Sequence, residues 1–361
     1  RLPLPTEDTI TAFTFNGNAA FGTRDGSLFF LAQNDKIVRM AHNTRQRIIE
    51  FAAAETSIAF LTESGELSFL PLDYRTFNRT GGLTLKERTG YTRISPLTVE
   101  KDQFLLWQTS NTARAALLDS QEQDAVAFTG TSGRFPLRSV SSRDNKILFM
   151  DAAGNISVYD QNDLNKKAIF TFSSAGAIDT AFISHEKIIL CRSVISGNSP
   201  FLIVNINTGE TLPLPHRSRA GIMVYSGGSG EIYGVAVEQD DGLKTTIIGL
   251  TDDKTDLTGR LIHDYPGEAI IHSLAESAGT LAIATNQGAA IFGKEIIDFE
   301  RTEGLPVKIL GCPQFFLSLD SEGNIAWHNN KNGKLLAVFS LYREKWILSG
   351  NREFSGGLFR P

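Results

Sequence analysis

Short apolar runs separated by polar turns follow one another along the whole chain. In the first example, residues 19–22 are apolar or small, Asp25-Gly26 interrupts them, and residues 28–31 are apolar again. An Asp-Gly pair tolerates the positive φ of a tight turn, so the pattern predicts a strand, a hairpin turn and a strand. The same order recurs around Gly65 and, near the end of the chain, around Gly323. The recurrence indicates an architecture rather than a chemistry.

The hairpin pattern has a period of a little over 40 residues. With the turn glycine or its equivalent as an anchor, successive units lie 39, 46, 43, 43, 45, 46 and 35 residues apart. These spacings fall within the range of propeller repeats. The anchors of the eight units are Gly26, Gly65, Asn111, Gly154, Gly197, Gly242, Gly288 and Gly323.

Each unit has room for four short strands. The first two read as nearly all apolar, which is typical of strands buried on both faces between neighbouring sheets. Helical signals are weak, since the best candidate, residues 113–122, falls where the repeat expects a strand. We therefore predict an all-β protein that forms one β-propeller domain over residues 1–361. Eight four-stranded blades are expected, with seven as the alternative, because the unit at Asn111 lacks a glycine and residues 342–361 form either a tail or a strand of another blade.

The hairpins at Gly26, Gly65, Gly154 and Gly323 and the turns at 207–210 (Asn-Thr-Gly-Glu) and 331–334 (Lys-Asn-Gly-Lys) carry a resemblance. With these motifs the chain resembles the superfamily of WD-like and PQQ-like repeat propellers. It has no Trp-Asp pair and only three tryptophans, so it departs from the signatures of both repeat types. Eight-bladed PQQ-like scaffolds of bacterial outer-membrane assembly are similar in size. The resemblance implies a rigid platform for protein partners.

Composition and charge narrow the class of partner. Hydrophobic residues make up 41% and charged residues 21% of the chain, which is ordinary for a globular protein. The net charge of −5 argues against a general nucleic-acid binder, because such proteins present a basic surface. No stretch approaches the roughly 20 apolar residues of a membrane helix. We expect a monomer that binds protein.

No constellation of residues predicts catalysis, a cofactor or a metal. Cys191 and Cys312 stand far apart in the sequence and are expected to be two buried thiols. The six histidines are scattered, and His263-Asp264 beside Tyr265-Pro266-Gly267 reads as a turn before it reads as a catalytic dyad. The acidic groups at 238–241 and 252–256 lack the spacing of a calcium loop and read as turns. At 320–324, the repeat's own turn accounts for the acidic residues.

The clearest departure from the repeat is segment 73–93, which is long for a connection between blades. Five basic residues oppose Asp73 and Glu87 in this segment, and aromatic residues lie among them. We hypothesise that it docks an acidic protein partner, because arginine and tyrosine are favoured at binding hot spots. The alternative is an outer strand whose charges protect a sheet edge. The candidate contact residues are Arg75, Arg79, Lys86, Arg88, Tyr91 and Arg93.

These features favour a non-enzymatic interaction scaffold, placed in the envelope of a bacterium or in another multiprotein assembly. The alternative is a propeller enzyme, such as a lyase, hydrolase or quinoprotein, with its site in the central channel. A ligand- or glycan-binding propeller is disfavoured by the low tryptophan count. The missing initiator methionine and the PQQ-like resemblance favour an exported protein, periplasmic or envelope-bound, over a cytoplasmic one.

Overall fold

A computed structural model describes most of the chain. The described residues are 10–15, 19–31, 37–43, 45–53, 57–71, 83–85, 93–96, 103–107, 115–119, 125–128, 135–162, 167–193, 199–214, 220–226, 232–238, 244–253, 256–266, 269–292, 295–300, 302, 304–312, 314–342 and 345–350. In these residues the secondary structure is β-strand and turn, with no helix. The described strands form eight sheets, of which seven have four strands and one has five. The prediction of an all-β chain of four-stranded units is confirmed.

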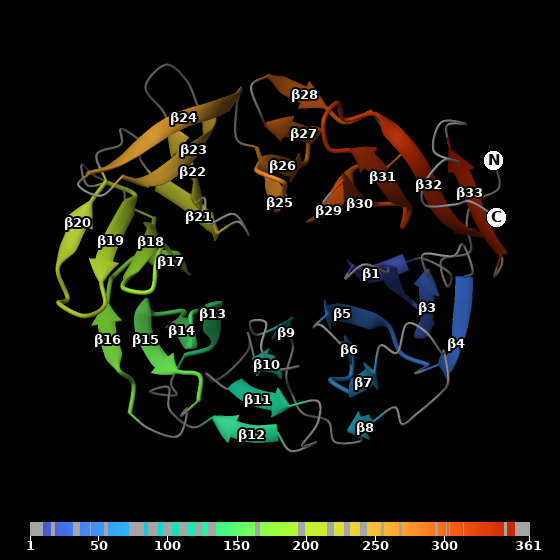
Figure 1. Ribbon diagram of the computed structural model, residues 1–361, viewed down its shortest axis with the longest axis horizontal. Coiled ribbons are helices and arrows are strands. Elements are labelled where there is room, and N and C mark those ends of the chain that lie inside the picture. The colour runs from blue at the N-terminus through green and yellow to red at the C-terminus, as the bar shows by residue number, and fades with distance from the viewer. Residues whose placement is uncertain are drawn as a thin grey trace. The chain divides into compact units, whose positions relative to one another are not determined.

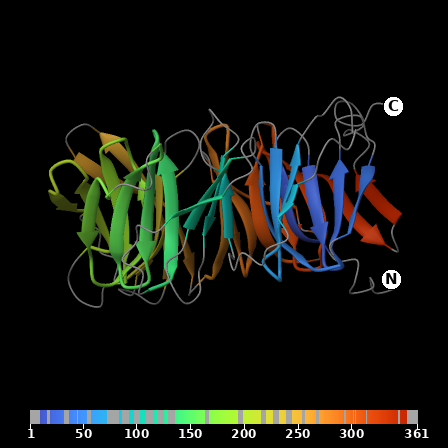
Figure 2. The same ribbon diagram turned by 90° about the horizontal axis from the view of Figure 1, so that it is seen from below.

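The chain divides into two compact units. One unit, residues 107–117 and 126–269, holds three sheets whose strands follow the chain order. In Figure 1 these strands run in colour from green through yellow to the golden-orange β24, and green strands of alternating direction are visible in Figure 2. Their strands are β13 (Leu137–Arg143), β14 (Lys146–Asp151), β15 (Asn155–Asp160), β16 (Phe170–Ser173); β17 (Ala177–Phe182), β18 (Lys187–Arg192), β19 (Phe201–Asn205), β20 (Thr211–Pro213); and β21 (Ala220–Ser226), β22 (Ile232–Glu238), β23 (Lys244–Asp253), β24 (Asp256–Pro266).

The other unit, residues 1–106, 118–125 and 270–361, holds four complete sheets. The first two contain β1 (Ile10–Phe15), β2 (Ala19–Thr23), β3 (Ser27–Leu31), β4 (Ile37–Asn43); and β5 (Ile48–Ala53), β6 (Ser57–Thr62), β7 (Leu67–Pro71), β8 (Leu83–Leu85). The last two contain β25 (Ile271–Ser277), β26 (Thr280–Thr285), β27 (Gly288–Phe292), β28 (Ile296–Asp298); and β29 (Pro306–Gly311), β30 (Phe315–Asp320), β31 (Ile325–Asn329), β32 (Leu335–Tyr342), β33 (Lys345–Gly350).

One further sheet has residues in both units. It contains β9 (Arg93–Pro96), β10 (Gln103–Trp107), β11 (Ala115–Asp119) and β12 (Ala125–Phe128). Strand β11 lies inside the stretch that was the best helix candidate, which confirms the strand expected from the repeat.

Buried polar side chains stabilise the turn between the second and third strands of a sheet. Asp151 Oδ1 accepts hydrogen bonds from the backbone N–H groups of Ala153 and Asn155, both at 2.9 Å. Asp320 Oδ1 does the same for Glu322 and Asn324, at 3.0 and 2.8 Å. The turn glycine that follows, Gly323, has φ +79°, where a side chain would be strained. The acidic residues at 320–324 are therefore explained by turn geometry, as expected.

The second strand of a sheet is buried on both faces. Every residue of β30 is buried, and β14 and β26 are each buried except for their first residue. In the β17–β24 part of the chain, Ile189 and Phe201 pack against Val224 and Ile248 of the neighbouring sheet. The apolar pattern of the second strands thus reflects contacts to a sheet on either side.

The first strand of seven sheets carries a β-bulge near its start. The register with the second strand shifts between the residues on either side of Thr11, Ile49, Arg138, Ile178, Ile222, His272 and Val307. A bulge bends a strand and re-aims the side chains beside it. The residues just after the bulge contribute most of the polar contacts described below.

The first and last sheets pack against each other through side chains. Phe21 of β2 stacks on Phe339 of β32 with ring centroids 5.7 Å apart, and Trp327 meets Phe339 edge-on at 6.0 Å. Ile10 belongs to the same buried cluster. Each of the two sheets is built from one continuous stretch of chain, and Figure 1 shows β1 to β4 beside β29 to β33. The strand after Tyr342, β33, extends the last sheet instead of starting another one.

Candidate functional site

Most of the predicted docking segment lies outside the described residues. This applies to Arg75, Arg79, Lys86, Arg88 and Tyr91, while Arg93 is the first residue of β9. Within the segment, β8 pairs with β7 and is the outer strand of its sheet. An outer strand is the alternative that the sequence left open for this segment. The structure therefore shows that strand and leaves the docking hypothesis untested.

Asp179, the third residue of β17, accepts three hydrogen bonds through its carboxylate. Its Oδ1 accepts hydrogen bonds from Ser139 Oγ of β13 at 2.8 Å and from the Thr180 N–H at 2.9 Å. Its Oδ2 accepts the Val224 N–H of β21 at 3.0 Å. One carboxylate thus ties together the first strands of three consecutive sheets.

The surroundings of Asp179 set its protonation. Burial raises the pKa of the carboxyl above its ordinary value, while the hydrogen bonds from Val224, Ser139 and Thr180 and the charge of Arg138 oppose that rise. Burial also raises the pKa of Cys191, and the nearby Asp179 charge adds to the effect. Because both oxygens of Asp179 are occupied by hydrogen bonds within the chain, its geometry is that of a structural tie.

A comparable tie joins two sheets of the other unit. Ser273, which follows the bulge in β25, bonds the backbone of Ile309 in β29: Ser273 Oγ donates to the carbonyl at 3.3 Å and accepts from the N–H at 3.1 Å. Ser277 Oγ, four residues further along β25, donates to the Cys312 carbonyl. Ser273 contacts Ile309, and Ser277 contacts Cys312. Because both residue numbers increase together, β25 and β29 run in the same direction.

Sequence reasoning missed these ties. Ser139, Asp179 and Ser273 occupy the same position, directly after the bulge, but they are of different residue types. The signal that could have revealed them is a polar residue at this place in an otherwise apolar first strand. It becomes visible only after the bulges have set the register of the repeats.

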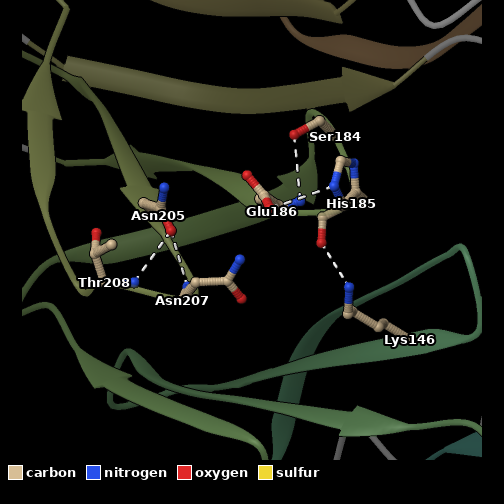
Figure 3. A network of polar contacts seen from close by, with 7 residues as sticks. All are labelled: Lys146, Ser184, His185, Glu186, Asn205, Asn207 and Thr208. Atoms are coloured by element: carbon tan, nitrogen blue, oxygen red, sulfur yellow. Dashed lines mark hydrogen bonds and ion pairs between the residues drawn. The ribbon is translucent and has the colours of Figure 1, made fainter.

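Figure 3 shows a second group of polar contacts, at the opposite ends of these strands. Lys146 Nζ donates to the His185 carbonyl at 2.7 Å, which links the β13–β14 hairpin to the β17–β18 hairpin. His185 Nε2 lies 3.4 Å from Glu186 Oε1 on the surface. Arg143 Nη1 reinforces the link with a 2.6 Å bond to the Ile183 carbonyl.

The turn beside this group is stabilised within itself. Asn205 Oδ1 accepts the N–H groups of Asn207 and Thr208 at 2.8 and 3.1 Å, and Gly209 has φ +75°. Gly209 thus has the left-handed backbone conformation that glycine adopts without strain. In the residues described by the structure, no group of three or more His, Cys, Asp or Glu side chains is arranged to hold a metal.

His328 and the two cysteines are buried side chains. The Nε2 atom of His328 lies 3.0 Å from Ser318 Oγ, which is also buried. The Phe299 ring stacks on the imidazole with the ring centroids 4.2 Å apart. Both cysteines are free and buried, as predicted. His263 and Asp264 belong to strand β24, so the prediction of a turn there is wrong; the pairing with β23 continues to Tyr265.

Exposed apolar side chains gather where β25 and β29 begin. Ile270 is 58% exposed, Leu305 47% and Val307 37%. Ile270 directly precedes β25 and Leu305 directly precedes β29, and these two strands are packed neighbours that run in the same direction. We call Ile270, Leu305 and Val307 the apolar turn surface.

The backbone holds this surface rigidly. The Ile270 N–H donates to Asn286 Oδ1 and its carbonyl accepts the Asn286 N–H, each at 3.1 Å. The Leu305 N–H donates to Ser321 Oγ at 3.1 Å and its carbonyl accepts the Ser321 N–H at 2.8 Å. Two exposed apolar residues on neighbouring sheets are therefore fixed in the same way to the turns of their own sheets.

Comparison with known proteins supports the fold. No protein-family model matches the chain, and no curated protein matches its sequence. Solved structures do match its fold: the WD40 β-propeller domain of Doa1 has a TM-score of 0.51 at 16% identity, covering 81% of this chain and 96% of that one.

Two further structures give the same result. The computationally designed Ika8 protein has a TM-score of 0.51 at 13% identity over 96% of this chain and 97% of that one. The β-propeller domain of Myceliophteria thermophila Cps50 (Swd1) has a TM-score of 0.51 at 12% identity over 90% and 97%. At these identities the likeness concerns the fold alone. The chain is an all-β protein with the β-propeller fold and four-stranded antiparallel blades, similar to WD40 propellers.

Proposed function

We propose that this protein is a non-enzymatic scaffold that binds another protein. The observation that carries the proposal is the apolar turn surface, where Ile270 and Leu305 are exposed yet held through both backbone groups. Exposed apolar residues that cluster on a soluble protein mark interaction sites. Side chains on a fixed backbone lose little entropy on binding, which favours affinity.

The proposal includes one architecture for the whole chain. We propose that residues 1–361 form a single propeller domain in which each of the eight sheets is one blade. The packing of the first sheet against the last through Phe21 and Phe339 supports this assignment. An experimental structure in which fewer than eight sheets share one domain would contradict it.

Segment 73–93 is the second part of the proposed interface. Its basic residues suit an acidic partner, and Arg75, Arg79, Lys86, Arg88, Tyr91 and Arg93 are the proposed contacts. Membership of a bacterial envelope assembly, or of another multiprotein assembly, is proposed for the same scaffold. Among the described residues, none forms a helix that could cross a bilayer.

The test compares three variants with the wild type in quantitative pull-downs analysed by mass spectrometry. The first is Ile270→Asp with Leu305→Asp, the second is Arg75→Glu with Arg79→Glu and Arg88→Glu, and the matched control is Leu212→Asp. Leu212 is 49% exposed but lies on the outer strand β20. We expect the first two variants to lose a partner that the wild type and the control retain.

Equal recovery of every partner by all four proteins would overturn the proposal. Loss with only one of the two variants would assign binding to the turn surface or to the segment. Circular dichroism of each variant confirms that the fold is intact before the pull-downs are compared.

A further inference from the structure

The outer strands of the sheets differ in how their free edges are protected. A bare edge presents unpaired N–H and C=O groups that can pair with another strand, and short strands, bulges or covering strands prevent this. Five outer strands have only three or four residues: β8, β12, β16, β20 and β28. Strand β32 has eight, and β33 covers it. Strand β4 has seven, but its pairing with β3 is interrupted between Phe29 and Ser27.

Strand β24 lacks these protections over its first half. It has 11 residues and is the outermost strand of its sheet in Figure 1. It pairs without interruption from Asp256 to Leu261, and the register shifts only at Ile262. No other described strand pairs with its outer side. Six regular residues of β24 therefore form an uncovered edge, equal in length to that of β33, whose six residues pair with β32 without interruption.

The hairpin geometry tells which residues present their backbone outward. Strands β23 and β24 are joined through the pair Asp253–Asp256, with two residues between them. In a two-residue hairpin the closing pair exchanges hydrogen bonds, and alternate pairs do so along the ladder. Thr258 and Arg260 then exchange backbone hydrogen bonds with their partners in β23, Thr251 and Gly249. Leu257, Gly259 and Leu261 direct their N–H and C=O groups to the free edge.

We propose that two copies of this chain associate by pairing the β24 edges antiparallel, with Gly259 on the two-fold axis. In this register Leu257 lies opposite Leu261 of the second copy, Gly259 opposite Gly259, and Leu261 opposite Leu257. Only outward-directed residues exchange backbone hydrogen bonds, as an antiparallel ladder requires. A surface that matches itself in this way gives a closed dimer.

The residue types favour this register over its neighbour. Moving the axis by one position to Arg260 would place two arginines directly opposite each other, and opposed like charges destabilise a strand pair. With the axis at Gly259, Arg260 faces Thr258 and the leucines face each other. Glycine within a strand often marks a close approach of another backbone. The proposal is independent of the protein-partner function above and replaces the monomer expected from the sequence.

The test is site-directed crosslinking. In a Gly259→Cys variant the two thiols meet at the axis, and the roughly 5.5 Å between Cα atoms of a hydrogen-bonded pair suits a disulfide. The native thiols are both buried and do not compete. A Leu212→Cys variant, on the exposed three-residue edge strand β20, is the control. Under mild oxidation we expect a disulfide dimer from the first variant at least about tenfold faster than from the control.

Sedimentation of the unmodified chain gives the second readout. One strand pair buries less than a standard interface of about 1,200–2,000 Å², so we expect weak dimerisation, evident between about 10 μM and 1 mM. A Leu261→Lys variant should remain monomeric over this range. A wild type that stays monomeric, or equal crosslinking of the two cysteine variants, overturns the proposal. A different protein captured at β24 by a monomeric wild type overturns it as well.

Discussion

Single polar residues in this protein act mainly as ties between neighbouring backbones. Asp179 accepts three hydrogen bonds from three different strands, and Ser273 satisfies both backbone groups of Ile309. Their bonding shows what they do, because a carboxylate with both oxygens occupied in this way is a structural acceptor.

Removal of the Asp179 carboxylate should destabilise the 137–266 sheets. In Asp179→Ala the Val224 N–H loses its acceptor and the Ser139 hydroxyl keeps only the Thr180 carbonyl, at 3.2 Å. We expect the unfolding free energy to fall by about 1–3 kcal/mol. Urea unfolding measures the change. Glu186→Ala, at an exposed position, should stay within about 0.5 kcal/mol of the wild type. A variant at Asp179 that matches this control would show that the tie adds nothing to stability.

His328 should make the protein sensitive to acid. Burial lowers the pKa of the imidazole from 6.5 to about 4. Between these values the unfolded chain binds a proton that the folded chain does not, so stability falls as the pH is lowered through this range. The full loss amounts to about 3 kcal/mol.

Urea unfolding at several pH values between 7.5 and 4.5 tests this expectation. His328→Gln should show a smaller loss than the wild type from pH 6.5 downward, while His185→Gln, on the surface, should follow the wild type. Parallel curves for all three proteins would contradict the assignment to His328.

At the scale of elements, glycines set how closely the strands approach. A Cβ on Gly311 of β29 would lie 1.7 Å from the Glu276 carbonyl oxygen of β25. Gly279, in the β25–β26 turn, has nothing within 4 Å of such a Cβ, but its φ is +75°. The two glycines are thus required for different reasons, one for space and the other for backbone conformation.

The two reasons predict different effects when asparagine, rather than alanine, replaces each glycine. Gly311→Ala should cost at least about 1–3 kcal/mol because backbones must separate, and Gly311→Asn should be no better. Gly279→Ala should cost about 1–2 kcal/mol, and Gly279→Asn less, since asparagine tolerates the left-handed conformation. Denaturant midpoints of the four variants provide the measurement. Recovery by asparagine at Gly311 would refute the steric explanation.

At the scale of the whole molecule, the contact between the first and last sheets depends on aromatic packing. Phe21 and Phe339 are both buried, and each comes from a sheet completed by its own stretch of chain. The two ends of the sequence are therefore joined by side chains. This arrangement makes a few residues responsible for holding distant parts of the chain together.

Loss of either ring should open this contact. We expect Phe339→Ala to lower the unfolding free energy by about 3–5 kcal/mol, as for other large-to-small changes in a core. Phe21→Ala should do likewise, and the double variant should lose less than the sum because the rings are partners. Chemical unfolding of all three variants measures the coupling. Strict additivity would show that the stacked pair contributes nothing beyond its separate contacts.

The sequence by itself determined the strand content and the repeat of this protein. Apolar runs with polar turns at a nearly constant interval leave few other ways to bury the apolar residues, and turns such as 207–210 need their glycines for local reasons. The strand expected in place of the helix candidate at 113–122 is likewise present, as β11. Local chemistry decides these features, so they can be recognised without knowledge of distant contacts.

Only the tertiary structure decided which side chains lie together. Ser139, Asp179 and Val224 are separated by roughly 40 residues each, and the bulges that bring them into contact have no strong sequence signature. The same holds for Ile270 and Leu305, whose shared exposure depends on the packing of β25 against β29. Contacts between repeats depend on register, and register is set by the assembled sheets.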